Sequence, residues 1–277
     1  MGSLTGSLAH SSVNSEKWVE RLAHWGFAAK GVVYVLIGAL AIMAALGRDQ
    51  QGADRNGAAQ LIFEQPFGKI LAILLVIGLA GYVVWRLIEG IKDPHHRGSD
   101  TKGIFQRVGY VFSGLVYGAF AYSLARTISG TGQSAGGGSK KSLAAKMIAT
   151  DWGPYALAAI GLLVMGIGLR YLYKAYKNNF VQQLNVHGVQ ARVKKWISRI
   201  GQIGYASRGI VWLIIGFFTL RAGITSNASE MKDSQGAFTF IEQSTGSIVL
   251  LIIAIGVVAY GGYMFVKAKY YRIRLNG

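Results

Sequence analysis

The sequence predicts an all-α transmembrane protein, a six-helix bundle built from three parallel two-helix repeats with pseudo-threefold character. Two observations predict this fold. Apolar residues make up 52% of the 277 residues and charged residues only 15%, which is not the composition of a soluble domain. One glycine-rich segment also recurs three times, and recurrence of this kind indicates a repeat architecture.

The repeat is clearest between Arg199 and Gly216. Placing Gly26, Gly109 and Gly204 in register separates the copies by 83 residues (109 minus 26) and by 95 residues (204 minus 109). The same offsets align further positions, among them Gly31/Gly114/Gly209, Tyr34/Tyr117/Trp212 and Gly78/Gly161/Gly256. Because positions in both halves of each copy align, the repeat is a pair of helices. The first and third repeats also share Tyr82 and Tyr260, so the second repeat is the divergent copy.

Six uncharged apolar blocks mark the expected spans, at 31–46, 70–85, 108–125, 152–169, 209–220 and 244–266. A bilayer core about 30 Å thick needs roughly 20 helical residues. Four blocks, of 16 to 18 residues, are a little shorter, and they reach this length once a flanking Lys or Arg extends its charge toward the interface. The block 209–220 has only 12 residues, and we still expect a span there because the aligned blocks of the other repeats are spans and residues 200–207 are also uncharged. Continuous rather than alternating apolar runs favour helices over barrel strands.

In chain order we expect a disordered tail (1–17), repeat one (18–93), a loop (94–103), repeat two (104–177), a basic amphipathic loop (178–198), repeat three (199–271) and a second tail (272–277). The first tail is rich in Ser and Gly, which rarely form a core. Short apolar stretches at 58–63 and 237–241 are expected as short helices at the outer surface. The Gly/Ser-rich stretch 130–141 is expected as a flexible linker.

Basic residues near the helix ends predict the topology. The two termini and the loops after the second and fourth spans hold 20 Lys and Arg residues, whereas the other three loops hold 9. Both termini should therefore be cytoplasmic. The same bias accounts for most of the net charge of +17, so nucleic acid is not an expected partner. The absence of cysteine excludes disulfides and thiol chemistry.

Glycines within the spans predict close helix packing, since small residues let backbones touch in lipid. Gly114 and Gly118 form a small-xxx-small pattern. The full set of candidates for helix packing is Gly31, Gly38, Gly114, Gly118, Gly209, Gly216, Gly78, Gly161 and Gly256.

Two layers of aligned residues are candidates for a functional site. Lys30, Ser113 and Arg208 align near the inner ends of the odd-numbered spans, and Met43, Arg126 and Arg221 align near the outer ends. Thirteen residues (43 minus 30) separate the layers, about 3.6 helical turns, so at most one layer can comfortably face a common axis. A ring of cations facing such an axis would favour anions. Alternatively, Lys30, Arg208, Arg126 and Arg221 extend to the interface and contact lipid.

A basic segment without acids precedes the third repeat. Its cations are interleaved with apolar residues, a pattern typical of a helix in the cytoplasmic interface, where each cation contributes about 1 kcal/mol against anionic lipid. An ordinary positive-inside linker is the alternative. The basic residues are Lys174, Lys177, Arg192, Lys194, Lys195 and Arg199. We expect a second anchor of this kind at Lys267, Lys269, Arg272 and Arg274. We interpret Arg86 and Glu89 as a structural i,i+3 pair.

No catalytic constellation is visible. The sequence has no serine or histidine triad, metal-ligand cluster or phosphate loop, so we expect neither an enzyme nor a cofactor or metal. Glu64, Asp151 and Glu242 lie at the edges of spans, and no proline breaks a helix at mid-membrane. Both features disfavour a coupled transporter.

The segment Arg199–Trp212, its variant from Trp25 to Tyr34 and the three-unit layout resemble the bacterial membrane proteins grouped as domain of unknown function 1206. The resemblance covers the chain from about Trp18 to Tyr271. It implies a six-helix bacterial inner-membrane protein with three tandem two-helix domains, and it brings no established activity, cofactor or catalytic residue. Ser113 departs from the family motif, which has Arg or Lys at that position.

These observations favour a non-enzymatic module that binds anionic lipid or a membrane-protein partner through its basic inner face. A small channel or facilitator for anions is the alternative, with Arg208 or Arg221 facing a central path.

Overall fold

The computed structural model describes residues 4–47, 55–63, 68–91, 100–129, 138–182, 184, 186 and 188–271. Within these residues the chain is helical apart from turns, a short 3-10 helix and one isolated β-bridge between Leu184 and Tyr271. The helices are α1 (Leu4–Ala45), α2 (Arg55–Phe63), α3 (Gly68–Ile91), α4 (Thr101–Ile128), α5 (Gly138–Ile148), α6 (Gly153–Lys177), α7 (Ala191–Ile224), α8 (Ser234–Thr245) and α9 (Ser247–Tyr270). The predicted all-α fold is confirmed.

Six helices in the described part of the chain are long and apolar enough to cross a membrane, namely α1, α3, α4, α6, α7 and α9. A helix satisfies its backbone N–H and C=O groups internally, which is why the uncharged runs fold as helices in lipid. The chain is a polytopic membrane protein.

Short polar signals set several helix ends. Asp100 caps α4 and Asp233 caps α8, each accepting a hydrogen bond at 3.0 Å from a glycine N–H three residues later. Pro154 lies in the first turn of α6, and Asn178 ends this helix in a left-handed conformation with φ of 52°. These residues fix the points at which the helices begin or end.

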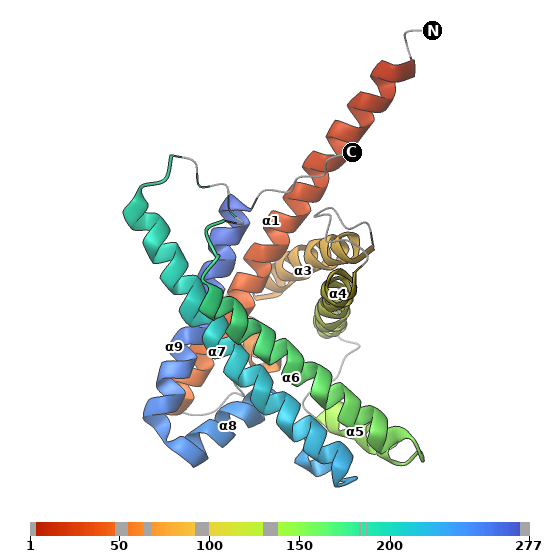
Figure 1. Ribbon diagram of the computed structural model, residues 1–277, viewed down its shortest axis with the longest axis vertical. Coiled ribbons are helices and arrows are strands. Elements are labelled where there is room, and N and C mark those ends of the chain that lie inside the picture. The colour runs from red at the N-terminus through yellow and green to blue at the C-terminus, as the bar shows by residue number, and fades with distance from the viewer. Residues whose placement is uncertain are drawn as a thin grey trace.

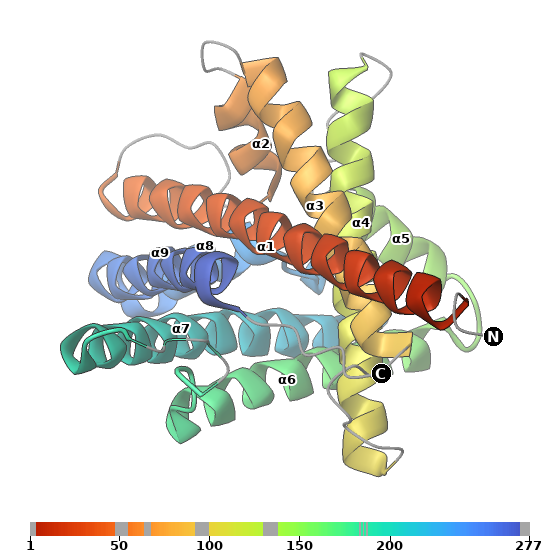
Figure 2. The ribbon, with the colours of Figure 1, turned by 90° about the horizontal axis from the view of Figure 1, so that it is seen from above.

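The six spans form three antiparallel pairs, α3 with α4, α6 with α7, and α9 with α1 (Figure 1). Each pair joins the second helix of one repeat to the first helix of the next, and the pair of α9 with α1 closes the cycle. Figure 2 shows α3 and α4 running across the direction of the other long helices. The pairing follows the threefold order of the repeats.

Packing within the repeats breaks this symmetry. α1 packs on α3 and α7 packs on α9, but α4 and α6 do not pack closely against each other. The spans of the middle repeat are also the least enclosed: 28% of the 18-residue apolar stretch in α4 and 22% of that in α6 is buried, whereas the stretch in α3, the next lowest, reaches 39%. The cycle is therefore open at the divergent repeat.

Three segments differ from the sequence expectations. α1 extends back to Leu4, through the tail that we expected to be disordered, because a helix that packing has already nucleated is extended at little cost. α5 begins at Gly138, within the expected linker, of which 130–137 lie outside the described residues. α7 begins at Ala191, so the end of the expected basic loop is helical. The expected short helices are present as α2 and α8, which bury Ile62 and Phe238.

Candidate functional site

Glycines bring the helix backbones together near the centre of the molecule. A Cβ atom at Gly26 would lie 2.5 Å from Cα of Tyr82, and one at Gly204 would lie 2.5 Å from Cα of Tyr260. These contacts are equivalent in the first and third repeats. They position two tyrosines on the inner faces of α3 and α9, because backbones approach this closely only where no side chain intervenes.

The candidate packing glycines lie at helix contacts. An added Cβ would be crowded by a neighbouring helix at Gly31, Gly38, Gly209, Gly216, Gly78, Gly161 and Gly256. Gly114 and Gly118 of α4 are less crowded, since the nearest atoms would lie 3.4 Å and 3.7 Å away. The contacts of α4 are thus looser than those of the other first helices.

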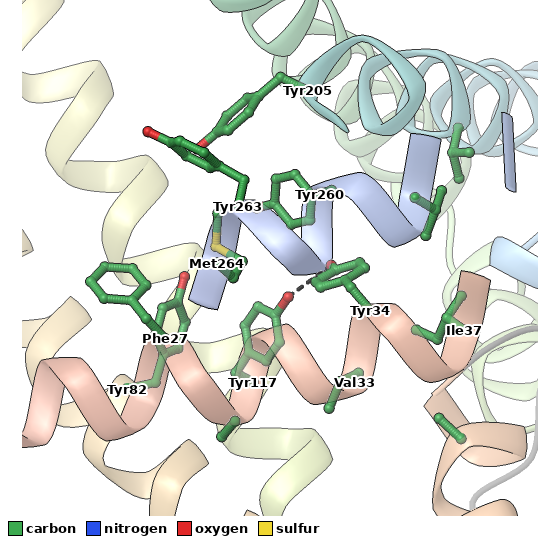
Figure 3. Close-up of a cluster of buried hydrophobic side chains, with 14 of the residues drawn as sticks. Phe27, Val33, Tyr34, Ile37, Tyr82, Tyr117, Tyr205, Tyr260, Tyr263 and Met264 are labelled. Atoms are coloured by element: carbon green, nitrogen blue, oxygen red, sulfur yellow. Dashed lines mark hydrogen bonds between the residues drawn. The ribbon is translucent and has the colours of Figure 1, made fainter. Parts of the chain in front are cut away.

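Four tyrosines fill the space between the helices, and we call them the tyrosine cluster: Tyr34, Tyr82, Tyr117 and Tyr260 (Figure 3). All are at most 3% exposed. Tyr117 donates a hydrogen bond to the Tyr34 hydroxyl at 2.7 Å. Edge-to-face contacts join Tyr34 to Tyr260 and Tyr82 to Tyr117, with ring centroids 4.8 and 4.9 Å apart. The cluster joins helices from all three repeats.

Lys30 lies inside the tyrosine cluster. Its Nζ donates to the Tyr82 hydroxyl at 3.0 Å and lies between 4.8 and 5.9 Å from the centroids of all four rings. Only 3% of the residue is exposed, so the ammonium group does not reach the lipid interface. Cation–π contacts contribute about 2 kcal/mol when desolvated, which offsets part of the cost of burying the charge.

A second group of charges extends from the tyrosine cluster toward the end of α3. Arg86 donates from Nε to the Tyr82 hydroxyl at 2.8 Å and from Nη1 to a carboxylate oxygen of Glu89. The Tyr271 hydroxyl donates to the other carboxylate oxygen at 3.2 Å. Burial and the neighbouring Glu89 carboxylate raise the pKa of Tyr271 well above its usual range, so this hydroxyl stays protonated and can donate.

Glu89 forms the ion pair with Arg86 that the i,i+3 spacing predicts. It lies near the end of α3, yet it is only 2% exposed. A side chain near the end of a span usually reaches solvent, but Tyr271 and the packed C-terminal end of α9 cover the Glu89 carboxylate.

Arg208 of α7 is buried against aromatic rings. The residue is 5% exposed, and its Nε has no hydrogen-bond partner. Its Cζ lies 4.3 Å from the ring centroid of Tyr34, 5.2 Å from that of Trp212 and 5.6 Å from that of Tyr260. Ring faces attract the positive charge, but they cannot satisfy five N–H donors as oxygen acceptors would. Arg208 therefore carries unused donor capacity in the interior.

Two further cations lie toward the loops. Nζ of Lys267 lies 4.1 Å from the Phe27 centroid and 4.4 Å from the Tyr271 centroid, and the residue is 6% exposed. Nζ of Lys174 lies 3.4 Å from the Tyr205 hydroxyl. We expected Lys267 to be an interfacial anchor, and this is wrong because α9 packs its last turns against Phe27 of α1.

Together these side chains form what we call the cationic cluster: Lys30, Arg86, Lys174, Arg208, Lys267 and Glu89. Its formal charge is +4, five cations minus one carboxylate. Ser113 also reaches it, with its hydroxyl 3.1 Å from that of Tyr82, so all three members of the inner layer meet the tyrosine cluster. An excess of buried positive charge over acceptors suits an anionic ligand. Among the described residues, no group of three His, Cys, Asp or Glu side chains could hold a metal ion.

The outer layer lies apart from this cluster. Arg126 is exposed near the end of α4, and Met43 is half-buried. Arg221 forms an ion pair with Glu230 at 3.1 Å, with 51% of its side chain exposed. The spacing of thirteen residues accounts for this result, because when Lys30 and Arg208 face inward the outer residues face away.

The basic segment is not a single interfacial helix. Lys174 and Lys177 end α6, and the following loop packs Phe180 and Leu184 into the bundle. Phe180 contacts the rings of Tyr205 and Tyr263, which explains why apolar residues that we expected to face lipid are buried. The remaining basic residues lie in the first turns of α7: Arg192, Lys194, Lys195 and Arg199.

Sequence reasoning missed Glu89 and Lys267 as members of a site. A signal was present, since the two residues occupy equivalent positions in the first and third repeats (89 plus 178 is 267). Both lie close to the end of a span, where a charge usually faces the interface. Only the packing of α9 on α1 shows that they are covered.

The comparisons with known proteins agree with the repeat architecture. The family model described as Domain of Unknown Function (DUF1206) matches three times, at residues 25–93, 108–178 and 203–271. The uncharacterized protein YxxB of Bacillus subtilis (strain 168) is 28% identical over 257 residues, which is 92% of each chain. No solved structure matches. Each matched segment contains one pair of membrane-spanning helices, so the chain holds three copies of the domain. Because the three matches together cover most of its length, the chain belongs to the family described as Domain of Unknown Function (DUF1206).

Proposed function

We propose that this protein is a non-enzymatic membrane module whose cationic cluster binds an anionic group, carried by a membrane lipid or by a partner membrane protein. Arg208 is the observation that carries the proposal, because it is buried, faces aromatic rings and has an Nε without a hydrogen-bond partner. This observation supports a binding region inside the bundle rather than along the basic inner face alone.

The balance of energies supports an anionic ligand. Burying an ion costs several kcal/mol even after the protein relaxes, and each cation–π contact returns about 0.5 to 2 kcal/mol. Hydrogen bonds between a guanidinium and an anionic oxygen are roughly twice as strong as neutral ones. An anion beside Arg208 and Lys30 would therefore supply acceptors that the aromatic rings do not.

A small channel or facilitator for anions is the alternative function. The inner layer of Lys30, Ser113 and Arg208 around one aromatic cluster favours it. The tyrosine rings weigh against it, since Tyr34 and Tyr82 are at most 1% exposed and occupy the centre of the bundle. Anion flux into liposomes above that of empty vesicles, altered by Arg208→Ala, would favour the channel.

The proposed location is the plasma membrane of a bacterium, with both termini in the cytoplasm. The unequal distribution of Lys and Arg between the loops supports this orientation. The similarity to a Bacillus subtilis protein supports a bacterial source. The proposal includes no cofactor and no nucleic-acid partner.

The binding proposal can be tested on the full chain purified in detergent. Phosphatidylglycerol and phosphatidylcholine are titrated separately, and bound lipid is counted by native mass spectrometry. We expect the anionic lipid to bind more tightly, and Arg208→Met to weaken its binding at least tenfold. Arg221→Met is the matched control, because that arginine lies at the surface. Equal binding of the two lipids, or unchanged binding by Arg208→Met, would contradict the proposal.

A further inference from the structure

We infer that the anionic ligand is the phosphate headgroup of an acidic phospholipid, and that it enters sideways between α4 and α6, the two helices of the middle repeat. This inference rests on the proposed function of the cationic cluster. We call the space between these two helices the middle seam; it is flanked by Gly109 and Ser113 of α4 and by Arg170 and Lys174 of α6.

The middle seam exists because one helix contact is missing. In the first and third repeats, a Cβ at Gly26 or Gly204 would meet the backbone of the second helix at 2.5 Å. The equivalent Cβ at Gly109 would meet only Nη1 of Arg170, at 3.4 Å. A flexible cationic side chain thus occupies the place that a packed helix fills in the other two repeats.

Arg170 is available to a ligand. The residue is half-buried, and within the described part of the chain its side chain makes no hydrogen bond, ion pair or aromatic contact. Lys174 follows one turn later on the same face, with its Nζ beside the Tyr205 hydroxyl. Two cations one turn apart are arranged to receive a single phosphate, and arginine can bind it with paired donors.

The middle seam leads to the cationic cluster. Ser113 follows Gly109 by one turn and contacts the Tyr82 hydroxyl, which accepts hydrogen bonds from Lys30 and Arg86. One turn deeper, Tyr117 donates to Tyr34, whose ring lies under Arg208. These contacts link the residues beside the middle seam to both groups of interior cations.

The position of the middle seam favours a lipid over a free anion. Arg170 lies seven residues before Lys177 at the end of α6, or about 10 Å along the helix axis. That depth is near the boundary between the hydrocarbon core and the headgroups. Nearby faces of both helices are apolar and exposed, with Val108 at 60% and Leu163 at 57%, and they can contact acyl chains.

The test compares ligands and variants of the full chain in detergent, with native mass spectrometry as the readout. The ligands are phosphatidylglycerol, phosphatidylcholine and inorganic phosphate. Arg170→Met removes the seam cation, and Gly109→Phe adds bulk to the seam at a position where a Cβ would meet only the end of that arginine. Arg126→Met is the control for lost surface charge. Gly262→Phe is the control for added bulk, because a Cβ there would meet only Ile200, at 4.0 Å. Thermal unfolding verifies that each variant is folded.

We expect phosphatidylglycerol to bind more tightly than phosphatidylcholine, with at least a fivefold loss in Arg170→Met and Gly109→Phe and none in the controls. Phosphatidylglycerol binding that is lost in Arg208→Met but unchanged in both seam variants would overturn the lateral route and leave the proposed function standing. Binding of inorganic phosphate, with no preference for phosphatidylglycerol over phosphatidylcholine, would contradict the inference that the ligand is a lipid headgroup. Binding of neither anion would overturn the proposed function itself.

Discussion

At the scale of single residues, aromatic rings allow positive charge to remain inside the bundle. Lys30 combines four ring faces with one hydrogen bond, whereas Arg208 relies on ring faces at Tyr34, Trp212 and Tyr260. Arg86 has a carboxylate partner instead. The three cations thus tolerate burial by different means, and Glu89 compensates only part of their charge.

Removing the charge of Glu89 should destabilise the protein more than removing a surface charge. In Glu89→Gln, Arg86 loses its carboxylate partner while 13% exposed, and an uncompensated buried charge costs about 3–5 kcal/mol. Loss of the exposed pair in Arg221→Ala should cost about 0–1 kcal/mol. Thermal unfolding in detergent should therefore show a lower midpoint for Glu89→Gln. Equal midpoints for the two variants would contradict the assigned role of Glu89.

At the scale of helices, one glycine contact recurs in two repeats and is absent from the third. Tyr82 and Tyr260 rest against Gly26 and Gly204, but the equivalent residue of α6 is Met165, which packs toward Gly216 of α7 instead. α6 consequently packs closely along α7 and does not pack closely against α4. The open packing of the middle repeat is thus linked to its divergent sequence, which has Met165 at the position of Tyr82 and Tyr260.

The glycine contacts predict a contrast between the repeats. Alanine at Gly26 or Gly204 must push apart two backbones, and overpacking of this kind costs about 1–3 kcal/mol. Alanine at Gly109 meets only the end of Arg170 and should be nearly neutral. The measurement is the unfolding midpoint of each single variant in the same detergent. A loss of stability in Gly109→Ala as large as that in Gly204→Ala would argue against an open middle seam.

At the scale of the whole molecule, three antiparallel helix pairs enclose a polar centre that a single repeat could not form. The first repeat contributes Lys30 and Tyr82, the second Ser113 and Tyr117, and the third Arg208 and Tyr260. Closing the cycle through α9 and α1 also covers Lys267 and Glu89. The site is therefore a property of all three copies together.

The orientation of the whole chain in the membrane can be tested with reporter fusions. A reporter placed after Gly277 should read cytoplasmic, and one inserted at 132–137 should read external. The reason is that the two termini and the loops after the second and fourth spans hold 20 Lys and Arg residues, whereas the other three loops hold 9. Paired reporters that are active on opposite sides serve as mutual controls. The reverse pattern would overturn the assigned orientation and move the middle seam to the outer leaflet.

The sequence by itself determined the number of spans, the repeat, the family and the alignment of Lys30, Ser113 and Arg208. These depend on composition and spacing, which a linear chain records directly. Only the tertiary structure decided that the inner layer meets the tyrosine cluster, that Glu89 and Lys267 are buried near it, and that α4 and α6 are separated. The physical reason is that burial depends on which helices touch. Helical spacing shows which residues share a face, but the partner of that face is set by contacts such as those of Gly26 and Gly204, whose tyrosine partners lie 56 residues further along the chain (82 minus 26, and 260 minus 204).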